Sequence, residues 1–232
     1  MRPAPVLALF AFGCTANGAQ GMVVLGNTAP SGATCSFTGA VGQSTLSSGE
    51  ISAASTVPYI LTPLIQSRLT AGSGGEPVDR SILLSSANVQ LTAGGASWPA
   101  FSSPVSGTLA PGGTINVSFP VIPVEILQTL NTGSAQIEVV STTTIIGDEG
   151  GGQVNSEPFT YGITVCPDGA PCVVNDLGTC GGLVAEVLVG NPCNPFQDGE
   201  VDCCSDVQDP TKLICPAVSE TAPGSGSAGS GM

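Results

Sequence analysis

The side chains that could perform chemistry in this 232-residue sequence are its carboxylates and its cysteines. Asp198, Glu200 and Asp202 stand at alternate positions around Gly199. A tight turn can bring oxygen ligands with this spacing to one point, as calcium-binding loops do. The segment lacks the glycine and the bidentate glutamate of an EF-hand, so a solvated acidic turn is the competing interpretation. We take these three acids as calcium candidates and predict no other metal and no cofactor.

Catalysis would have to rest on carboxylates, because the chain has no histidine for a Ser-His-Asp or Cys-His arrangement. Its 17 Asp and Glu residues permit many pairs, but no Asp-Thr-Gly or Asp-Ser-Gly motif occurs. We therefore predict that the protein is not an enzyme, and a carboxylate-dependent hydrolase is the least favoured alternative. Only 4 Lys and Arg residues oppose those acids. The sequence thus lacks the basic surface that nucleic acid binding requires.

The chain has 9 cysteines, an odd number. Cys14 differs from the others because it follows Arg2 and an apolar run over residues 6–12. The remaining eight cysteines could form four disulfides in an oxidising compartment, whereas a metal–thiolate cluster would need paired CxxC spacings that are absent. Seven of the eight follow residue 165, so at least one of them cannot be paired within that region, and Cys35 is the partner left once Cys14 is lipidated. The predicted disulfide cysteines are Cys35, Cys166, Cys172, Cys180, Cys193, Cys203, Cys204 and Cys215.

Residues 1–14 resemble a bacterial lipoprotein signal, in which a peptidase cuts before a cysteine that then carries a diacylglycerol. Gly13 stands directly before Cys14, and the preceding apolar run is far shorter than the roughly 20 residues that span a bilayer. The resemblance implies an exported lipoprotein with the membrane as partner through its anchor. Thr15, in place of an aspartate, implies sorting to the outer membrane or cell surface. A plain secretory signal is the alternative.

Composition divides the chain into five parts. We predict a signal peptide at 1–13, a tether at 14–21, a β-sandwich domain at 22–165, a cysteine-rich appendage at 166–218 and a disordered tail at 219–232. The appendage has few large apolar residues, so its order must depend on disulfides. Its one apolar cluster, at 182–188, predicts a short helix.

Residues 22–165 alternate between apolar and polar side chains with the period of a β-strand. Ala87, Val89 and Leu91 should face a core, and glycine- and proline-rich stretches at 110–113 and 147–152 should reverse the chain. The pattern predicts an all-β fold, an Ig-like antiparallel β-sandwich, with one short connecting helix at 123–130. Other strands are predicted around residues 35–37, 57–61, 115–121, 135–146 and 159–165.

Two stretches carry further resemblances. The run Gly-Thr-Leu-Ala-Pro-Gly-Gly at 107–113, followed by the alternating residues 115–121, resembles Ig-like late-embryogenesis-abundant or fibronectin-type domains. Residues 191–204 resemble the tails of bacterial surface lipoproteins. The first resemblance implies the sandwich fold, and the second implies no particular activity.

Loops of the sandwich, at 72–77 and 93–103, are the expected contact surface for a protein or glycan ligand. Trp98 and Phe101 are the exposed-aromatic candidates in the second loop, with packing against the core as the alternative. We therefore expect an acidic, exported, non-catalytic binding or structural surface protein. A calcium-dependent adhesin or ligand-binding module that uses the acids of the C-terminal region is the second possibility.

Overall fold

The computed structural model describes residues of the chain between Ala19 and Ile214. Cys14, Cys215, the signal segment, the loop at 72–77 and the predicted helix at 182–188 lie outside the described residues. The described ranges are 19–30, 35–37, 39–42, 44–53, 55–70, 80–130, 135–167, 172–180, 190–191, 193–195 and 197–214.

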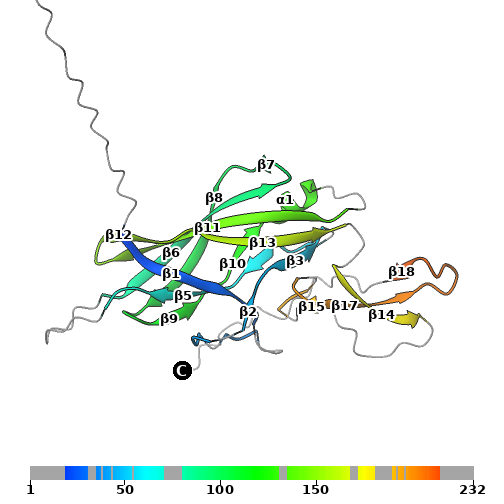
Figure 1. Cartoon of the computed structure of the whole chain (residues 1–232), viewed down its shortest axis with the longest axis horizontal. Coiled ribbons are helices and arrows are strands. Elements are labelled where there is room, and N and C mark those ends of the chain that lie inside the picture. Colours follow the sequence, from blue (N-terminus) through cyan, green and yellow to red (C-terminus); the bar gives the residue numbers. More distant parts are fainter. Residues whose placement is uncertain are drawn as a thin grey trace, which may run out of the picture.

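The sandwich is built around two long strands, β6 (Ile82–Ala93) and β11 (Ile137–Glu149), which pair antiparallel along most of their length. β8 (Phe101–Leu109) lies on the other side of β6, and β13 (Phe159–Cys166) pairs with the first half of β11. β3 (Gly49–Ser52) pairs in parallel with β13 and lies at the edge of the sheet (Figure 1). This layer places its buried side chains against one side of the core.

β1 (Ala19–Thr28) carries the sheet around to the other side of the core. Its first residues pair in parallel with β12 (Gly152–Ser156), and its later residues pair antiparallel with β5 (Pro63–Ser67). β5 in turn pairs with β9 (Thr114–Asn116). The shorter elements are β2 (Thr45–Leu46), β4 (Tyr59–Leu61), β7 (Ala96–Ser97), β10 (Phe119–Ile122) and α1 (Val124–Thr129).

One apolar core fills the space between the layers. The alternation predicted from the sequence is confirmed in β6, where Ala87, Val89 and Leu91 are fully buried while Asn88 faces solvent. The predicted helix is α1, which buries Leu127. The predicted fold class is confirmed, although the sheet is mixed because β1 and β3 each make a parallel pairing. Within the described residues, no helix is long and apolar enough to cross a membrane.

The structure corrects two of the predicted strands. Residues 35–37 are not a strand, since Cys35 lies in an exposed turn with φ 51°, a left-handed conformation that strands exclude. The predicted strand at 115–121 is two strands, because β9 ends at Asn116 and β10 begins at Phe119 with a different partner, β4. Alternation alone does not say which strand a segment pairs with, so it misses this change of partner.

Two predicted boundaries also move. β1 begins at Ala19, so the last three residues of the predicted tether at 14–21 belong to the sandwich. The predicted break at 147–152 is shorter, because β11 runs to Glu149 and the chain reverses at Gly150 and Gly151, whose φ values of 59° and 91° suit glycine.

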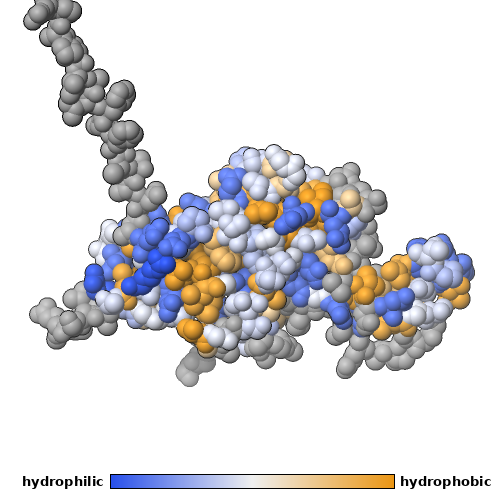
Figure 2. Space-filling model, viewed as in Figure 1, coloured by the Kyte–Doolittle hydropathy of each residue, from blue (hydrophilic) through white to orange (hydrophobic). Residues whose placement is uncertain are grey.

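The appendage projects from one end of the sandwich (Figure 1). β14 (Val173–Thr179) and β17 (Glu200–Ser205) pair in parallel, and β18 (Leu213–Ile214) pairs with β17. A two-residue ladder joins β15 (Gly190–Asn191) to β16 (Asn194–Pro195). Figure 2 shows apolar side chains on the surface of this part. The exposed large apolar residues there are Leu177, Val207, Leu213 and Ile214.

Disulfides restrain the appendage in addition to its strand pairing. One of them crosses to the sandwich, so the link from Cys35 to the C-terminal region that the cysteine count predicts is present. Disulfides in this number are typical of an exported protein. The bonded pairs are Cys35–Cys193, Cys166–Cys172 and Cys180–Cys204, and Cys203 is also disulfide-bonded.

The disulfide across the junction should contribute more stability than the one inside the appendage. Cys35 and Cys193 are 158 residues apart, whereas Cys180 and Cys204 are 24 apart. On the chain-entropy relation, these loops correspond to about 5 and about 3.5 kcal/mol. We expect Cys35→Ala with Cys193→Ala to lower the free energy of urea unfolding more than Cys180→Ala with Cys204→Ala does. An equal or smaller loss would contradict this order.

Candidate functional site

Besides the Cys35–Cys193 disulfide, the appendage contacts the sandwich through two consecutive residues that form hydrogen bonds with it, Gln197 and Asp198. Gln197 forms an antiparallel bridge with Ile51 on β3, and the Asp198 amide donates to the Glu50 carbonyl at 3.0 Å. The Glu50 amide donates in return to the Asp198 Oδ1 at 2.8 Å. These contacts add a short segment of the appendage to the edge strand of the large sheet.

The Gln197 side chain reaches a second strand, β4. Its Oε1 accepts from the Ile60 amide at 2.8 Å, and its Nε2 donates to the Ile60 carbonyl at 2.8 Å. The amide group thus pairs with Ile60 as a neighbouring strand would. Since Gln197 is 3% exposed, these bonds are shielded from water. One residue therefore joins β3 and β4, which belong to different sheets.

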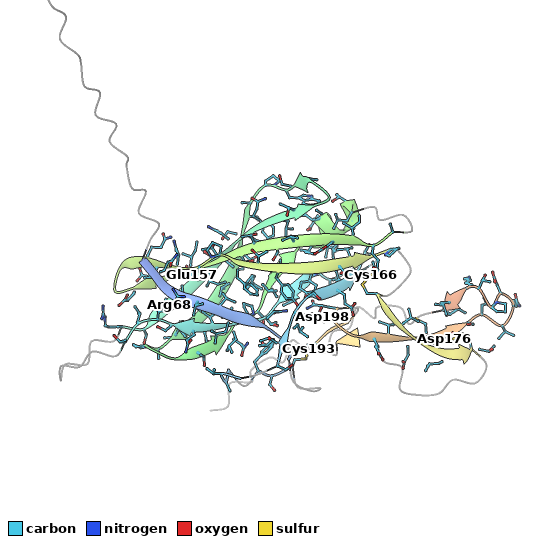
Figure 3. All side chains as sticks on the ribbon, in the orientation of Figure 1. Arg68, Glu157, Cys166, Asp176, Cys193 and Asp198 are labelled. Atoms are coloured by element: carbon cyan, nitrogen blue, oxygen red, sulfur yellow. A yellow bond between two sulfur atoms is a disulfide. The ribbon has the colours of Figure 1, made fainter. Side chains whose placement is uncertain are left out.

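Asp198 places a carboxylate in this seam (Figure 3). Besides the Glu50 amide, the Tyr59 hydroxyl donates to it at 2.8 Å and 3.1 Å, and the Gln197 Nε2 donates to Oδ2 at 2.8 Å. Burial raises the pKa of Asp198 above its ordinary value of 3.8, although these hydrogen bonds favour the ionised form. Burial, together with the charge of Asp198, also raises the pKa of Glu50.

Tyr59 connects the carboxylate to the core. Its side chain is fully buried, and burial followed by the negative charge of Asp198 raises the pKa of Tyr59 well above 10.0. The ring lies directly over Gly49, where a Cβ atom would stand 2.0 Å from the Tyr59 hydroxyl oxygen and 2.6 Å from Cζ. Glycine at this position is therefore what allows the hydroxyl to reach Asp198.

A cavity of about 220 Å³, which we call the junction cavity, lies beside these residues. Its walls come from the sandwich, from the appendage and from the disulfide that joins them. Asp198 and Gln197 line one part, and apolar groups line much of the rest. The other lining residues are Thr28, Ala29, Pro30, Cys35, Phe37, Ile60, Thr62, Ser118 and Cys193.

A larger hollow of about 670 Å³ lies at the turn between β6 and β7 and beside the start of β11. Gly94, Gly95, Ala96 and Ser97 form much of its lining, and Glu138 contributes a carboxylate. Most of this lining comes from an exposed turn, and Glu138 is also exposed, so the hollow shields its polar groups little from water. The junction cavity, with a partly buried carboxylate held by three donors, is the better candidate site.

The three calcium candidates do not come together. Asp198 turns into the junction, Glu200 is exposed and Asp202 is buried on β17. Within the part of the chain that the structure describes, no group of three or more His, Cys, Asp or Glu residues could hold a metal ion. The three acids alternate in the sequence, but the left-handed backbone of Asp198, with φ 50°, turns its side chain toward the sandwich and away from the other two acids.

The aromatic candidates lie near the larger hollow rather than the junction. Trp98 and Phe101 are both partly buried and pack against the core, the alternative that their sequence positions left open. Ala93 and Ser97, from the same predicted contact loop at 93–103, line the larger hollow. Sequence reasoning missed Tyr59 and Gln197 as site residues.

No family model matches the chain, and no curated protein matches it. Some solved structures resemble about half of it. Protein AT1g01470 from Arabidopsis thaliana is 14% identical, with 52% of this chain and 78% of that chain covered at a TM-score of 0.34. A putative late embryogenesis abundant protein, At2g46140.1, is 13% identical over 49% of this chain and 64% of that chain, with a TM-score of 0.34.

A third similar structure is AggA, the major subunit of aggregative adherence fimbriae type I from Escherichia coli. It is 11% identical over 51% of this chain and 87% of that chain, with a TM-score of 0.27. These three similarities cover about half of this chain and carry no argument about it.

Gly49→Ala should disrupt the seam because its methyl group would displace the Tyr59 ring. We expect a loss of roughly 2–4 kcal/mol in the free energy of unfolding, from overpacking and a weakened hydrogen bond to a charged group. Urea unfolding measures this loss. Gly152→Ala is the matched control, since its Cβ would stand 3.5 Å from the Glu149 carbonyl oxygen, an ordinary contact.

A double-mutant cycle with Tyr59→Phe tests the stated cause. Because Phe lacks the hydroxyl that overlaps the new methyl group most closely, Gly49→Ala should cost less in the Tyr59→Phe background. If the losses of the two single variants add up to the loss of the double variant, Gly49→Ala does not act through the Tyr59 hydroxyl.

Proposed function

We propose that the protein is an exported, non-catalytic binding protein that is held at the outer membrane by a lipid on Cys14 and takes its ligand into the junction cavity. The observation that carries the proposal is a cavity lined by a partly buried carboxylate whose position is fixed by Tyr59, Gln197 and the Glu50 amide. Ligand sites typically combine apolar walls with a few oriented polar groups in this way.

The composition of the cavity favours binding over catalysis. Among the described residues that line it, Asp198 is the one ionisable side chain, because Cys35 and Cys193 are joined in a disulfide. Hydrolysis by carboxylates commonly needs a second carboxyl group across the substrate, and the sequence has no histidine to act as a base. A single carboxylate with three donors is suited to holding a ligand.

The lipid anchor is supported by the sequence before Cys14 and by the disulfides. Cys14 follows an apolar run and Gly13, as the lipidated cysteine does in lipoprotein signals. The disulfides are those of an exported protein. A lipid of two or three acyl chains would hold the protein firmly, since one chain binds membranes only marginally.

Cys14→Ser should release the protein from the membrane. In a bacterium that processes lipoproteins, we expect the unaltered protein to label with palmitate and to partition into detergent, and the variant to do neither. Cys35→Ala, which removes a disulfide cysteine, is the control and should keep the label. Palmitate labelling of the Cys14→Ser protein would contradict the anchor.

The binding site can be located without knowing the ligand. We would titrate the oxidised mature protein with a panel of amino acids, monosaccharides, short alkylamines and fatty acids, and follow backbone amides by NMR. At least one class should shift the amides of Ile60, Thr62 and Gln197, because these residues line the cavity.

Ser118→Trp places an indole on the cavity wall and should abolish those shifts. Ser102→Trp, at an exposed position of β8 outside the cavity lining, is the matched control and should leave them unchanged. Shifts confined to other surfaces, or shifts that survive Ser118→Trp, would show that the junction cavity is not the binding site.

A further inference from the structure

Among the residues that the structure describes, no cation balances the charge of Asp198 in the seam. The three groups that donate to its carboxylate, the Glu50 amide, the Tyr59 hydroxyl and the Gln197 amide, are all neutral. Neutral donors stabilise an ionised carboxylate but do not cancel its charge. Asp198 therefore retains a net negative charge beside a cavity that it lines.

The described cations of the chain are placed elsewhere. Arg68 pairs with Glu157 at 2.7 Å, and Figure 3 shows this pair at the opposite end of β1 from Asp198. Arg80 pairs with Glu149 at 3.0 Å beside the β11–β12 turn, and Lys212 is exposed just before β18. A buried charge without a partner is costly, so a cation that entered the cavity would gain a favourable contact.

The walls of the cavity suit an aliphatic chain. Phe37, Ile60, Pro30 and the Cys35–Cys193 disulfide present apolar surface to the same space that Asp198 lines. At the volume that one molecule occupies in liquid water, about 30 Å³, the cavity holds about seven non-hydrogen atoms. This size fits a short alkyl chain with one polar end.

The net charge of the whole protein also favours a cationic ligand. With 17 acidic and 4 basic residues, the formal net charge is −13. Such a field raises the local concentration of cations and speeds their encounter with the surface, most strongly at low ionic strength. Anionic ligands of the same size would be repelled and would also meet the charge of Asp198.

From these observations, and resting on the proposed binding function, we infer that the junction cavity binds a primary ammonium group carried on a short aliphatic chain, with Asp198 as its counter-ion. Two sources share this chemistry, a free alkylamine and the lysine side chain of a protein. In both, the ammonium supplies the missing positive charge and a further hydrogen-bond donor, while the methylene groups lie against the apolar walls.

The test compares three probes of similar size on the oxidised mature protein: pentylamine, pentan-1-ol and pentanoate. We expect pentylamine to shift the amides of Ile60, Thr62 and Gln197, and pentan-1-ol to bind at least about tenfold more weakly because it lacks the charge. Pentanoate should cause no shift. This comparison uses the unaltered protein, so it does not depend on a variant that folds.

Asp198→Asn should weaken pentylamine binding at least about tenfold, because the counter-ion is lost. Asp209→Asn, at an exposed acid of the appendage, is the matched control and should leave binding unchanged. In the unaltered protein, pentylamine affinity should also fall as the pH is lowered through the raised pKa of Asp198, since protonation removes the charge that the ammonium needs.

The two sources are separated by titrating Nα-acetyl-lysine-N-methylamide and a lysine-containing peptide beside pentylamine. Tighter binding of the peptide indicates a protein partner, and tighter binding of pentylamine indicates a free amine. Pentan-1-ol or pentanoate binding as tightly as pentylamine overturns the preference for ammonium and leaves the binding function standing. If no probe of any class shifts the cavity amides, the binding function itself is wrong.

Discussion

The junction between the sandwich and the appendage depends on one partly buried carboxylate. A charge that leaves water must recover its hydration from donors in the protein, and Asp198 does so through a backbone amide, a phenol and a side-chain amide that come from β3, β4 and the appendage. If any of these donors moved away, the carboxylate would lose a hydrogen bond that stabilises its charge. The position of the appendage on the sandwich is thereby fixed by electrostatics as well as by the Cys35–Cys193 bond.

The same contacts protect the edge of a sheet. β3 is short and pairs with β13 on one side, which leaves its other edge open to strands of other molecules. Gln197 and Asp198 occupy part of that edge with backbone and side-chain hydrogen bonds. The appendage therefore serves the sandwich as a cover for β3 as well as supplying one wall of the cavity.

The sequence predicts the fold better than the site for a physical reason. Burial of Val89 or the helix around Leu127 follows from side chains close in sequence, which alternation and capping reveal. The role of Asp198 depends on Tyr59, which lies 139 positions earlier, so its acidic neighbours suggest a local calcium turn that does not form. The number of cysteines predicts one long-range contact, the bond between Cys35 and the appendage, and the structure contains this bond. The cysteine count does not predict that Cys35 lies in a left-handed turn.

The distance between Cys35 and Cys193 has a consequence for how the protein matures. If the chain crosses the membrane from its N-terminus, Cys35 reaches the oxidising side long before Cys193, and Cys166, Cys172 and Cys180 arrive in between. With Cys14 lipidated as proposed, an oxidase that joins the other cysteines in order of appearance would pair Cys35 with Cys166, a bond that the folded protein does not contain. Correct maturation then requires thiol–disulfide exchange, a slow step that takes seconds to hours and that a disulfide isomerase accelerates. The yield of folded protein should accordingly be set by the redox enzymes of the compartment that receives the chain.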